Sequence, residues 1–212
     1  MKKILVVGAH GQTGQQVVSQ LTQNDNMQPI AGVRNQSQVK EFTDQGIEAR
    51  VVDARQSVND IKQQLTGVDA IVISIAGGWM IDLDGKVKLY QAAEQAGIKR
   101  VVLVSAGAIQ HFHDEKKLPW MDQWAEYSAA MYYADLILLN SNLDYTIVRP
   151  ENLTNEVGTG KVTIGDYLPH NYTRRANVAA VIVASLEDDN TIRKAFDVED
   201  GSTPIEDALK QL

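Results

Sequence analysis

A glycine-rich turn near the amino terminus constrains the fold of this chain more than any other feature. A β-branched run at residues 3–7 leads into Gly8-Ala9-His10-Gly11-Gln12-Thr13-Gly14, and an amphipathic segment follows at 12–23. Glycine permits a tight turn and close approach of the backbone, while a helix amino terminus carries partial positive charge. The spacing G-x-x-G-x-x-G between a strand and a helix therefore predicts a βαβ unit whose turn holds a dinucleotide pyrophosphate.

The alternation of strand-like and helix-like segments continues along the chain. Short apolar runs predict strands at 3–7, 28–33, 48–52, 70–75, 101–104, 145–148 and 195–198. Helical periodicity predicts helices at 12–23, 37–45, 58–65, 86–96, 123–139, 174–186 and 205–212. This order is typical of an α/β fold with a doubly wound parallel sheet of the Rossmann type. Segments 106–122 and 151–171 fit neither pattern, and because both follow strands we expect them at the edge where ligands bind.

Length and composition limit the remaining possibilities. The 212 residues suit one domain, 1–212, in which a small carboxyl-terminal region completes a substrate cleft. A net charge of -7 without a long basic run argues against nucleic acid, and the absence of cysteine excludes disulfides and thiolate metal sites. Since no apolar run approaches the roughly 18 residues of a membrane helix, we expect no membrane contact and a cytoplasmic location.

The ends of the second and third strands bear on the choice of nucleotide. Arg34 follows the second strand, about twenty residues after Gly14, where NAD-selective sites hold an acid. A guanidinium there would pair with the 2′-phosphate of NADP(H), although a solvated surface arginine is the alternative and NAD(H) stays possible. Asp53, followed by Ala54, ends the third strand and could accept a hydrogen bond from the adenine amino group.

Histidine and tryptophan side chains near the presumed cleft leave several questions open. His10 would contact phosphate or stay an exposed turn residue. The loop at 110–115 carries a His-x-His pair beside two acids, but its ligand number and spacing do not match a zinc site, so we predict a polar loop and no metal. Trp120 and Trp124 would form an apolar lid over a planar substrate or anchor their loop.

Several segments together resemble one known family. The glycine turn at 8–14, Leu143-Asp144-Tyr145-Thr146-Ile147-Val148-Arg149-Pro150, the loop at 153–160 and the helix at 177–182 are similar to motifs of the atypical short-chain dehydrogenase/reductases. That family of NAD(P)-binding proteins includes biliverdin reductase B-like flavin reductases and NmrA-like redox sensors. The resemblance covers essentially the whole chain.

The resemblance also implies roles for individual residues. It assigns the pyrophosphate to the glycine turn, the adenine ribose to the end of the fourth strand, the nicotinamide to the end of the sixth, and the catalytic serine to Ser105. The expected cofactor-binding set is Gly8, His10, Gly11, Gln12, Thr13, Gly14, Arg34, Asp53, Ala54, Ala76, Gly77, Ser105, Pro150 and Asn152. Ser105 could hydrogen-bond a substrate carbonyl or the nicotinamide amide, or be an ordinary polar strand end.

One departure from the family concerns proton transfer. Members of that family with the full catalytic machinery carry Y-x-x-x-K on the helix after the fifth strand, whereas this chain has Tyr127 and Met131 in those positions. Residues four apart share a helix face, so a lysine there could lower the pKa of the tyrosine and hold the cofactor ribose. Methionine does neither, which leaves Tyr127 a weak catalytic candidate beside Ser105.

These features lead to one main expectation and two alternatives. The main one is an NADP(H)-binding oxidoreductase that transfers hydride to a small planar acceptor, a flavin, quinone or carbonyl compound, because orientation matters more than a protein acid for the first two. A non-catalytic NADP(H) sensor is the alternative that Met131 favours. A nucleotide-sugar epimerase is third, since its chemistry relies on the tyrosine–lysine pair. The physiological substrate and the choice between monomer and homodimer stay open.

Overall fold

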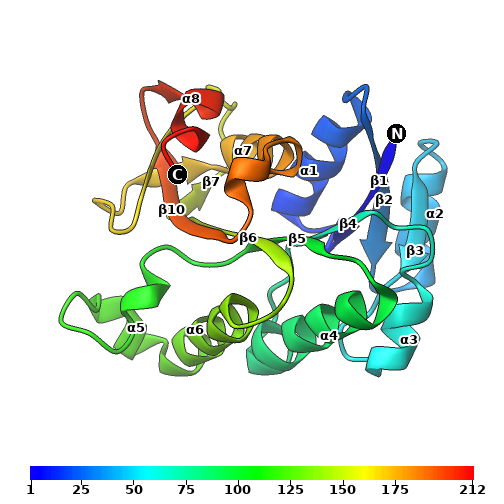
Figure 1. Ribbon diagram of the computed structural model, residues 1–212, viewed down its shortest axis with the longest axis horizontal. Coiled ribbons are helices and arrows are strands. Elements are labelled where there is room, and N and C mark those ends of the chain that lie inside the picture. Colours follow the sequence, from blue (N-terminus) through cyan, green and yellow to red (C-terminus); the bar gives the residue numbers. More distant parts are fainter.

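A nine-stranded sheet forms the centre of the computed structural model, which describes residues 1–212 (Figure 1). Its strand order is β11-β8-β10-β6-β5-β4-β1-β2-β3. The strands are β1 (Lys2–Val7), β2 (Met27–Val33), β3 (Glu48–Val51), β4 (Ala70–Ile73), β5 (Arg100–Val104), β6 (Asp144–Pro150), β8 (Lys161–Gly165), β10 (Lys194–Asp200) and β11 (Thr203–Pro204). From β10 to β3 every neighbouring pair is parallel, while β8 pairs antiparallel with β10 and β11. The predicted doubly wound α/β fold is confirmed.

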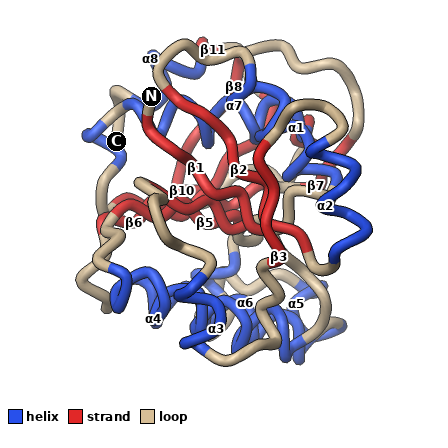
Figure 2. The backbone as a smooth tube through the Cα atoms, turned by 90° about the vertical axis from the view of Figure 1, so that its right-hand side faces the viewer, coloured by secondary structure: helices blue, strands red, loops and turns tan.

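Helices cover both faces of this sheet, as the tube view shows (Figure 2). They are α1 (Gln12–Thr22), α2 (Gln36–Thr43), α3 (Val58–Gln63), α4 (Lys86–Ala96), α5 (Pro119–Gln123), α6 (Ala125–Leu139), α7 (Arg175–Glu187) and α8 (Ile205–Leu209). A π-helix, η1 (Met80–Gly85), precedes α4, and two 3-10 turns are η2 (Ile109–His111) and η3 (Asp189–Thr191). One core packs α1, α2, α7 and α8 on the sheet, and the other packs α3, α4 and α6 on its opposite face. None of these helices has the length and apolar character needed to cross a bilayer.

The inner strands β1, β4 and β5 are mostly apolar because both of their faces are covered. In β1, Ile4 and Val6 pack toward α1, whereas Leu5 and Val7 pack toward α4, and all four are buried. Alternate side chains of a strand point to opposite faces, so a strand between two helical layers reads as a continuous apolar run. This pattern is the physical reason why the sequence locates the central strands well.

The structure differs from the sequence-based expectation in the two irregular segments. Segment 106–122 contains η2 and the short helix α5, and segment 151–171 contains β8 and β7 (Asn152–Thr154), which pairs with β9 (Tyr172–Arg174). The predicted helix 123–139 begins only at Ala125, because Trp124 has non-helical backbone angles. Strand β8 is held by pairing with β10 far along the chain, and local periodicity carries no signal for such pairing.

Candidate functional site

A cleft of about 670 Å³ opens at the carboxyl ends of the parallel strands, where β1 lies between β2 and β4. After β1 the chain continues to β2 on one side of β1, whereas after β4 it continues to β5 on the other side. The strand order reverses between β1 and β4, and open α/β sheets bind ligands at such a switch point. The lining residues come from both irregular and regular segments. They are Gly8, His10, Gly11, Gln12, Thr13, Gly32, Val33, Arg34, Gln38, Val52, Asp53, Ala54, Arg55, Ser74, Ile75, Ala76, Gly77, Met80, Ile81, Val104, Ser105, Tyr127, Met131, Leu153 and Arg175.

The glycine turn brings β1 and α1 too close together for side chains. Gly8 has φ +89°, and a Cβ on it would lie 3.0 Å from the Ile75 side chain and clash with the Ser74 carbonyl. A Cβ on Gly14 would clash with the Gly8 carbonyl group, lying 2.9 Å from its carbon. Gly11 caps α1 with no side-chain hydrogen bond, and no acid occupies the first helical turn. The exposed amides of this turn are therefore available to an anion, as the sequence predicts.

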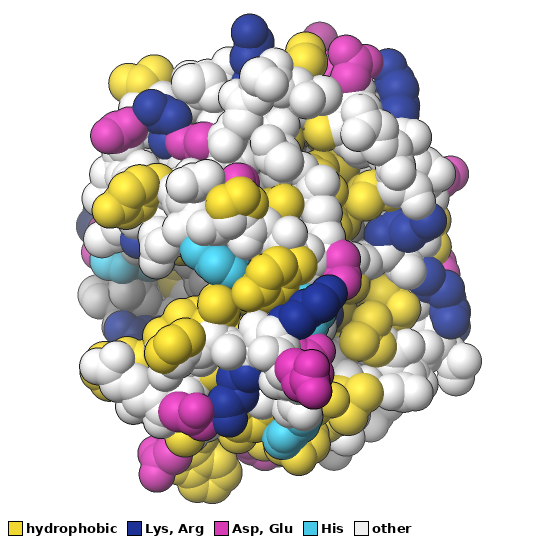
Figure 3. Space-filling view, turned by 90° about the vertical axis from the view of Figure 1, so that its left-hand side faces the viewer, with side chains coloured by type: hydrophobic (Ala, Val, Ile, Leu, Met, Phe, Trp, Pro, Cys, Tyr) yellow, Lys and Arg dark blue, Asp and Glu magenta, His cyan; other side chains and the backbone are white.

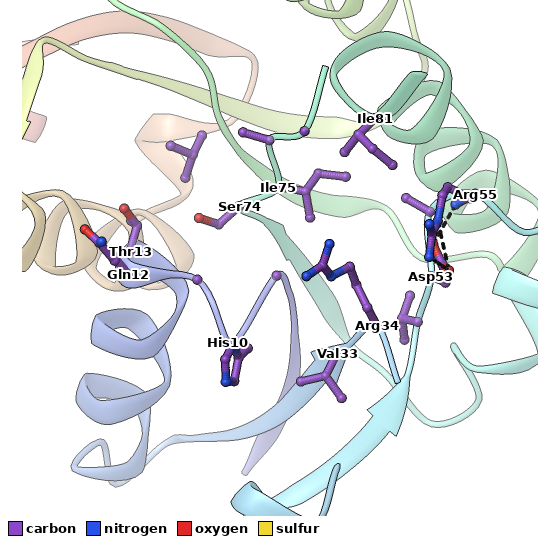
Figure 4. Close-up of a pocket in the computed structure, with 18 of the residues that line it drawn as sticks. His10, Gln12, Thr13, Val33, Arg34, Asp53, Arg55, Ser74, Ile75 and Ile81 are labelled. Atoms are coloured by element: carbon purple, nitrogen blue, oxygen red, sulfur yellow. Dashed lines mark hydrogen bonds and ion pairs between the residues drawn. The ribbon is translucent and has the colours of Figure 1, made fainter. Parts of the chain in front are cut away.

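Arginines give the nucleotide side of the cleft a positive charge within an acidic protein. Arg34 points into the cavity, and its guanidinium makes no hydrogen bond or ion pair within the chain (Figure 4). Asp53 is the only carboxylate lining the cleft, and Arg55 holds it with a nitrogen–oxygen distance of 2.7 Å. The hydrogen bond from Arg55 lowers the pKa of Asp53. Two phosphate-pairing groups, Arg34 and the glycine turn, are thus left without a partner from the protein.

Other predicted binding residues divide into those that line the cleft and those that do not. Gln12, Thr13, Ala54, Ala76, Gly77 and Ser105 line it. His10 also lines it, and its ring nitrogen lies 3.0 Å from Glu41 on the surface. Gly14, Pro150 and Asn152 do not line the cleft, and the Asn152 amide instead donates to the His170 carbonyl.

The two residues of the incomplete tyrosine motif do share one wall of the cleft. Tyr127 and Met131 both line it from α6. Tyr127 keeps 37% of its surface exposed, and burial of the rest, with Asp82 and Asp135 nearby, raises the pKa of its phenol to about 12. The Tyr127 side chain is therefore protonated at neutral pH, which suits a proton donor and not a base.

Ser105 is held in place by a buried ion pair. Its Oγ donates to Asp135 at 2.7 Å, and Asp135 pairs with Arg149 at 2.9 Å. Both charged side chains are at most 4% exposed. The serine therefore has a fixed orientation at the cleft wall, set by α6 and β6.

Three functional candidates escape the sequence-based prediction. Lys86 is buried against Met131, Asp82 is buried and accepts a hydrogen bond from the Gly77 amide, and Arg175 lines the cleft from the start of α7. Lys86 interrupts the apolar face that α4 forms with Leu89 and Ala93, and this charge on an apolar stripe is the signal that could have identified it.

A second polar group lies beyond the serine end of the cleft. Glu151 bonds His170 at 2.8 Å and rests against Gly107, while Asp197 accepts from Gln110 at 3.1 Å. Burial raises the pKa of Asp197 to about 7. Gln110 comes after β5, Glu151 comes directly after β6, and Asp197 lies within β10. Their proximity depends on strand order and is invisible in the sequence.

The histidine loop and the tryptophans occupy the neighbouring surface, which Figure 3 shows as histidine side chains among apolar ones. His111 is buried and bonds Asp114 at 2.7 Å, which fixes the loop. Trp120 packs beside Met131 and Tyr127, with ring centroids of Trp120 and Tyr127 6.4 Å apart, whereas Trp124 is exposed. Trp120 thus anchors its segment to α6, and neither tryptophan lines the cleft.

The comparisons with known proteins agree with this geometry. A family model described as "NAD(P)H-binding" matches residues 8–189, which include the glycine turn, Arg34, Ser105 and Tyr127. The chain belongs to this NAD(P)H-binding family. A Bacillus subtilis relative named "Uncharacterized sugar epimerase YhfK" is 38% identical over 218 residues, covering 99% of this chain and 100% of the relative.

Solved structures place this NAD(P)H-binding chain among Rossmann-type oxidoreductases. The oxidoreductase ylbE from Lactococcus lactis is 35% identical with a TM-score of 0.89, covering 99% of this chain and 96% of that one. A short-chain dehydrogenase/reductase from Veillonella parvula in complex with NADP has a TM-score of 0.77 at 18% identity, over 96% of each chain, and shows likeness of fold alone. The predicted family is confirmed at this level, and the atypical subgroup stays a prediction.

Proposed function

We propose that the chain is an NADP(H)-dependent oxidoreductase that transfers hydride to a small planar acceptor, a flavin, quinone or carbonyl compound. The observation that carries the proposal is the charge pattern of the cleft. Arg34 is unpaired at the end of β2, while the only carboxylate lining the cleft, Asp53, is occupied by Arg55. NAD-selective sites use a free acid at the ribose, and a free guanidinium suits a 2′-phosphate.

The residues of the cleft fit a bound dinucleotide. The free amides of Gln12 and Thr13 at the start of α1 would hold the pyrophosphate, and Arg34 the 2′-phosphate, whereas the amides of Gly8 and Gly11 already donate to the carbonyls of Gly32 and Gly8. Bound NADPH would supply a hydride to the acceptor. Ser105, whose hydroxyl proton is donated to Asp135, would accept a hydrogen bond from the nicotinamide amide, and Tyr127, protonated at neutral pH, would face the same region as a donor to the acceptor. The Lactococcus relative described as an oxidoreductase supports this choice.

A non-catalytic sensor is the second candidate, and Met131 in the lysine position favours it. A nucleotide-sugar epimerase is the third, because a relative carries that name, but the same missing lysine weakens it. Location in the cytoplasm and a monomeric or homodimeric state stay predictions.

Nicotinamide fluorescence separates these candidates. The purified protein is mixed with NADPH or NADH, and the signal is followed before and after adding quinones, flavins and aldehydes. Binding followed by acceptor-dependent loss above the protein-free rate supports the oxidoreductase. Binding without loss supports the sensor, and no binding of either nucleotide contradicts all three candidates.

Arg34→Ala is expected to weaken NADPH binding about 10- to 100-fold while changing NADH binding less than about threefold, because only NADPH offers a phosphate to the guanidinium. Fluorescence titration with both nucleotides measures the difference. Lys40→Ala, which removes an exposed positive charge of α2 outside the cleft, is the matched control and is expected to change neither affinity. Equal losses for the two nucleotides in Arg34→Ala would remove the assignment of the 2′-phosphate.

A further inference from the structure

A lysine lies buried directly behind the cleft wall. Lys86 begins α4 and is completely buried. The only hydrogen-bond acceptor of its Nζ is the thioether sulfur of Met131, 2.8 Å away. A thioether is a weak acceptor, so an ammonium in this place costs free energy that an apolar side chain would not. Packing alone gives no reason for a lysine at this position.

Two carboxylates act on the ammonium without pairing with it directly. Burial lowers the pKa of Lys86, and the attraction of Asp135 from α6 and Asp82 from η1 opposes this lowering. Asp135 is also paired with Arg149 of β6. On α4 itself, the hydroxyl of Tyr90 is buried without a partner. Lys86 thus sits within a buried cluster of charges that continues to Ser105 through Asp135.

The same cluster acts on Tyr127. Asp82 and Asp135, the two carboxylates that attract Lys86, are also the two that raise the pKa of the Tyr127 phenol. Met131 separates the ammonium from the cleft, and Tyr127 lies one helical turn before Met131 on the same wall. The Lys86 ammonium therefore lies at the end of the Met131 side chain. A lysine at position 131 of α6 would place its own ammonium in the same region.

We propose that Lys86 is a positioning residue for Tyr127, supplying from α4 the positive charge that α6 lacks at Met131. The inference rests on the proposed oxidoreductase function and narrows the acceptor to a carbonyl compound. Bound NADPH would supply hydride to the carbonyl carbon as the C=O π bond breaks, and the carbonyl oxygen would take the proton of the Tyr127 hydroxyl to give an alcohol. The tyrosinate would be balanced by the charge of Lys86 and would regain the one H⁺ that the overall reaction consumes from solvent.

The first test reads the Tyr127 phenol directly and needs no nucleotide. Difluorotyrosine is incorporated at position 127, and its titration is followed by ¹⁹F NMR. Lys86→Met is expected to raise the pKa of this phenol by about one unit, because Asp82 and Asp135 lose their compensating cation. Lys88→Met, on the same helix but paired with Asp84 at the surface, is the matched control and is expected to leave it unchanged.

Rescue distinguishes charge from packing. The double variant Lys86→Ala with Met131→Lys returns the ammonium to α6 and is expected to restore the lower pKa of the phenol. Lys86→Gln serves as a second neutral variant, and circular dichroism checks folding in each. An unchanged phenol pKa in folded Lys86→Met and Lys86→Gln proteins would overturn the proposal.

Turnover supplies an independent measurement. With an aldehyde acceptor, Lys86→Met and Tyr127→Phe are each expected to lower kcat about 100-fold without adding in the double variant, while NADPH affinity stays within about threefold. If the double variant instead lost kcat by the product of the two single losses, Lys86 would not act through Tyr127. If the unaltered protein binds NADPH but reduces no acceptor, the proposed function fails, and the NMR titration still decides whether Lys86 acts on the phenol.

Discussion

Gly14→Ala is expected to reduce NADPH affinity at least about 100-fold, or about 2.7 kcal/mol. A Cβ at this position would lie 3.0 Å from the Ala9 Cα and clash with the Gly8 carbonyl, both of which are backbone and cannot rotate away. The first turn of α1 must then move from β1, which misaligns the amides that receive the pyrophosphate. Titration of nicotinamide fluorescence measures the loss.

Two other glycines serve as controls for this substitution. A Cβ at Gly11 would lie 3.1 Å from the Gly8 oxygen, which is a milder contact than at Gly14. Gly11→Ala is therefore expected to reduce NADPH affinity less than Gly14→Ala. Gly97 has φ +76° and open space around it, so Gly97→Ala is expected to cost about 1 kcal/mol of stability with no change in NADPH affinity. A Gly14→Ala protein that binds NADPH as tightly as the unaltered one would show that the turn does not hold the nucleotide.

Arg149→Met is expected to lower the free energy of unfolding by about 3–5 kcal/mol, because it leaves the buried carboxylate of Asp135 without its cation. Asp197 also faces Arg149, and the loss of this attraction adds to the raised pKa of Asp197. In a chain of this size the change corresponds to a drop in Tm of about 10 °C. Thermal and urea unfolding measure it.

The comparison for this substitution is an exposed ion pair of the same type. Lys40 and Asp44 form an i,i+4 pair with side chains 76% and 61% exposed, so Lys40→Met is expected to cost less than about 0.5 kcal/mol. Replacing both buried partners, as Asp135→Leu with Arg149→Met, should be less harmful than Arg149→Met alone. If Arg149→Met and Lys40→Met lower the free energy of unfolding by the same amount, the buried ion pair contributes no more to stability than the exposed one.

The sequence predicts the framework of the cleft well because the relevant signals are local. The turn at 8–14 joins adjacent elements, and Arg34 directly follows the largely apolar strand β2. Pro150 and Asn152 follow the predicted strand 145–148 but do not line the cleft. The Asn152 side chain donates to the His170 carbonyl, a partner from another segment that the local sequence does not reveal.

The sequence by itself determined the βαβ start, the order of strands and helices, and the arginine at the nucleotide end, since periodicity and turn chemistry depend on neighbours in the chain. Only the tertiary structure decided that Lys86 meets Met131 across two helices, and that Asp135 joins Ser105 to Arg149. These charges are buried together by packing between elements far apart in sequence. Their energies depend on that shared burial, which no local pattern of residues encodes.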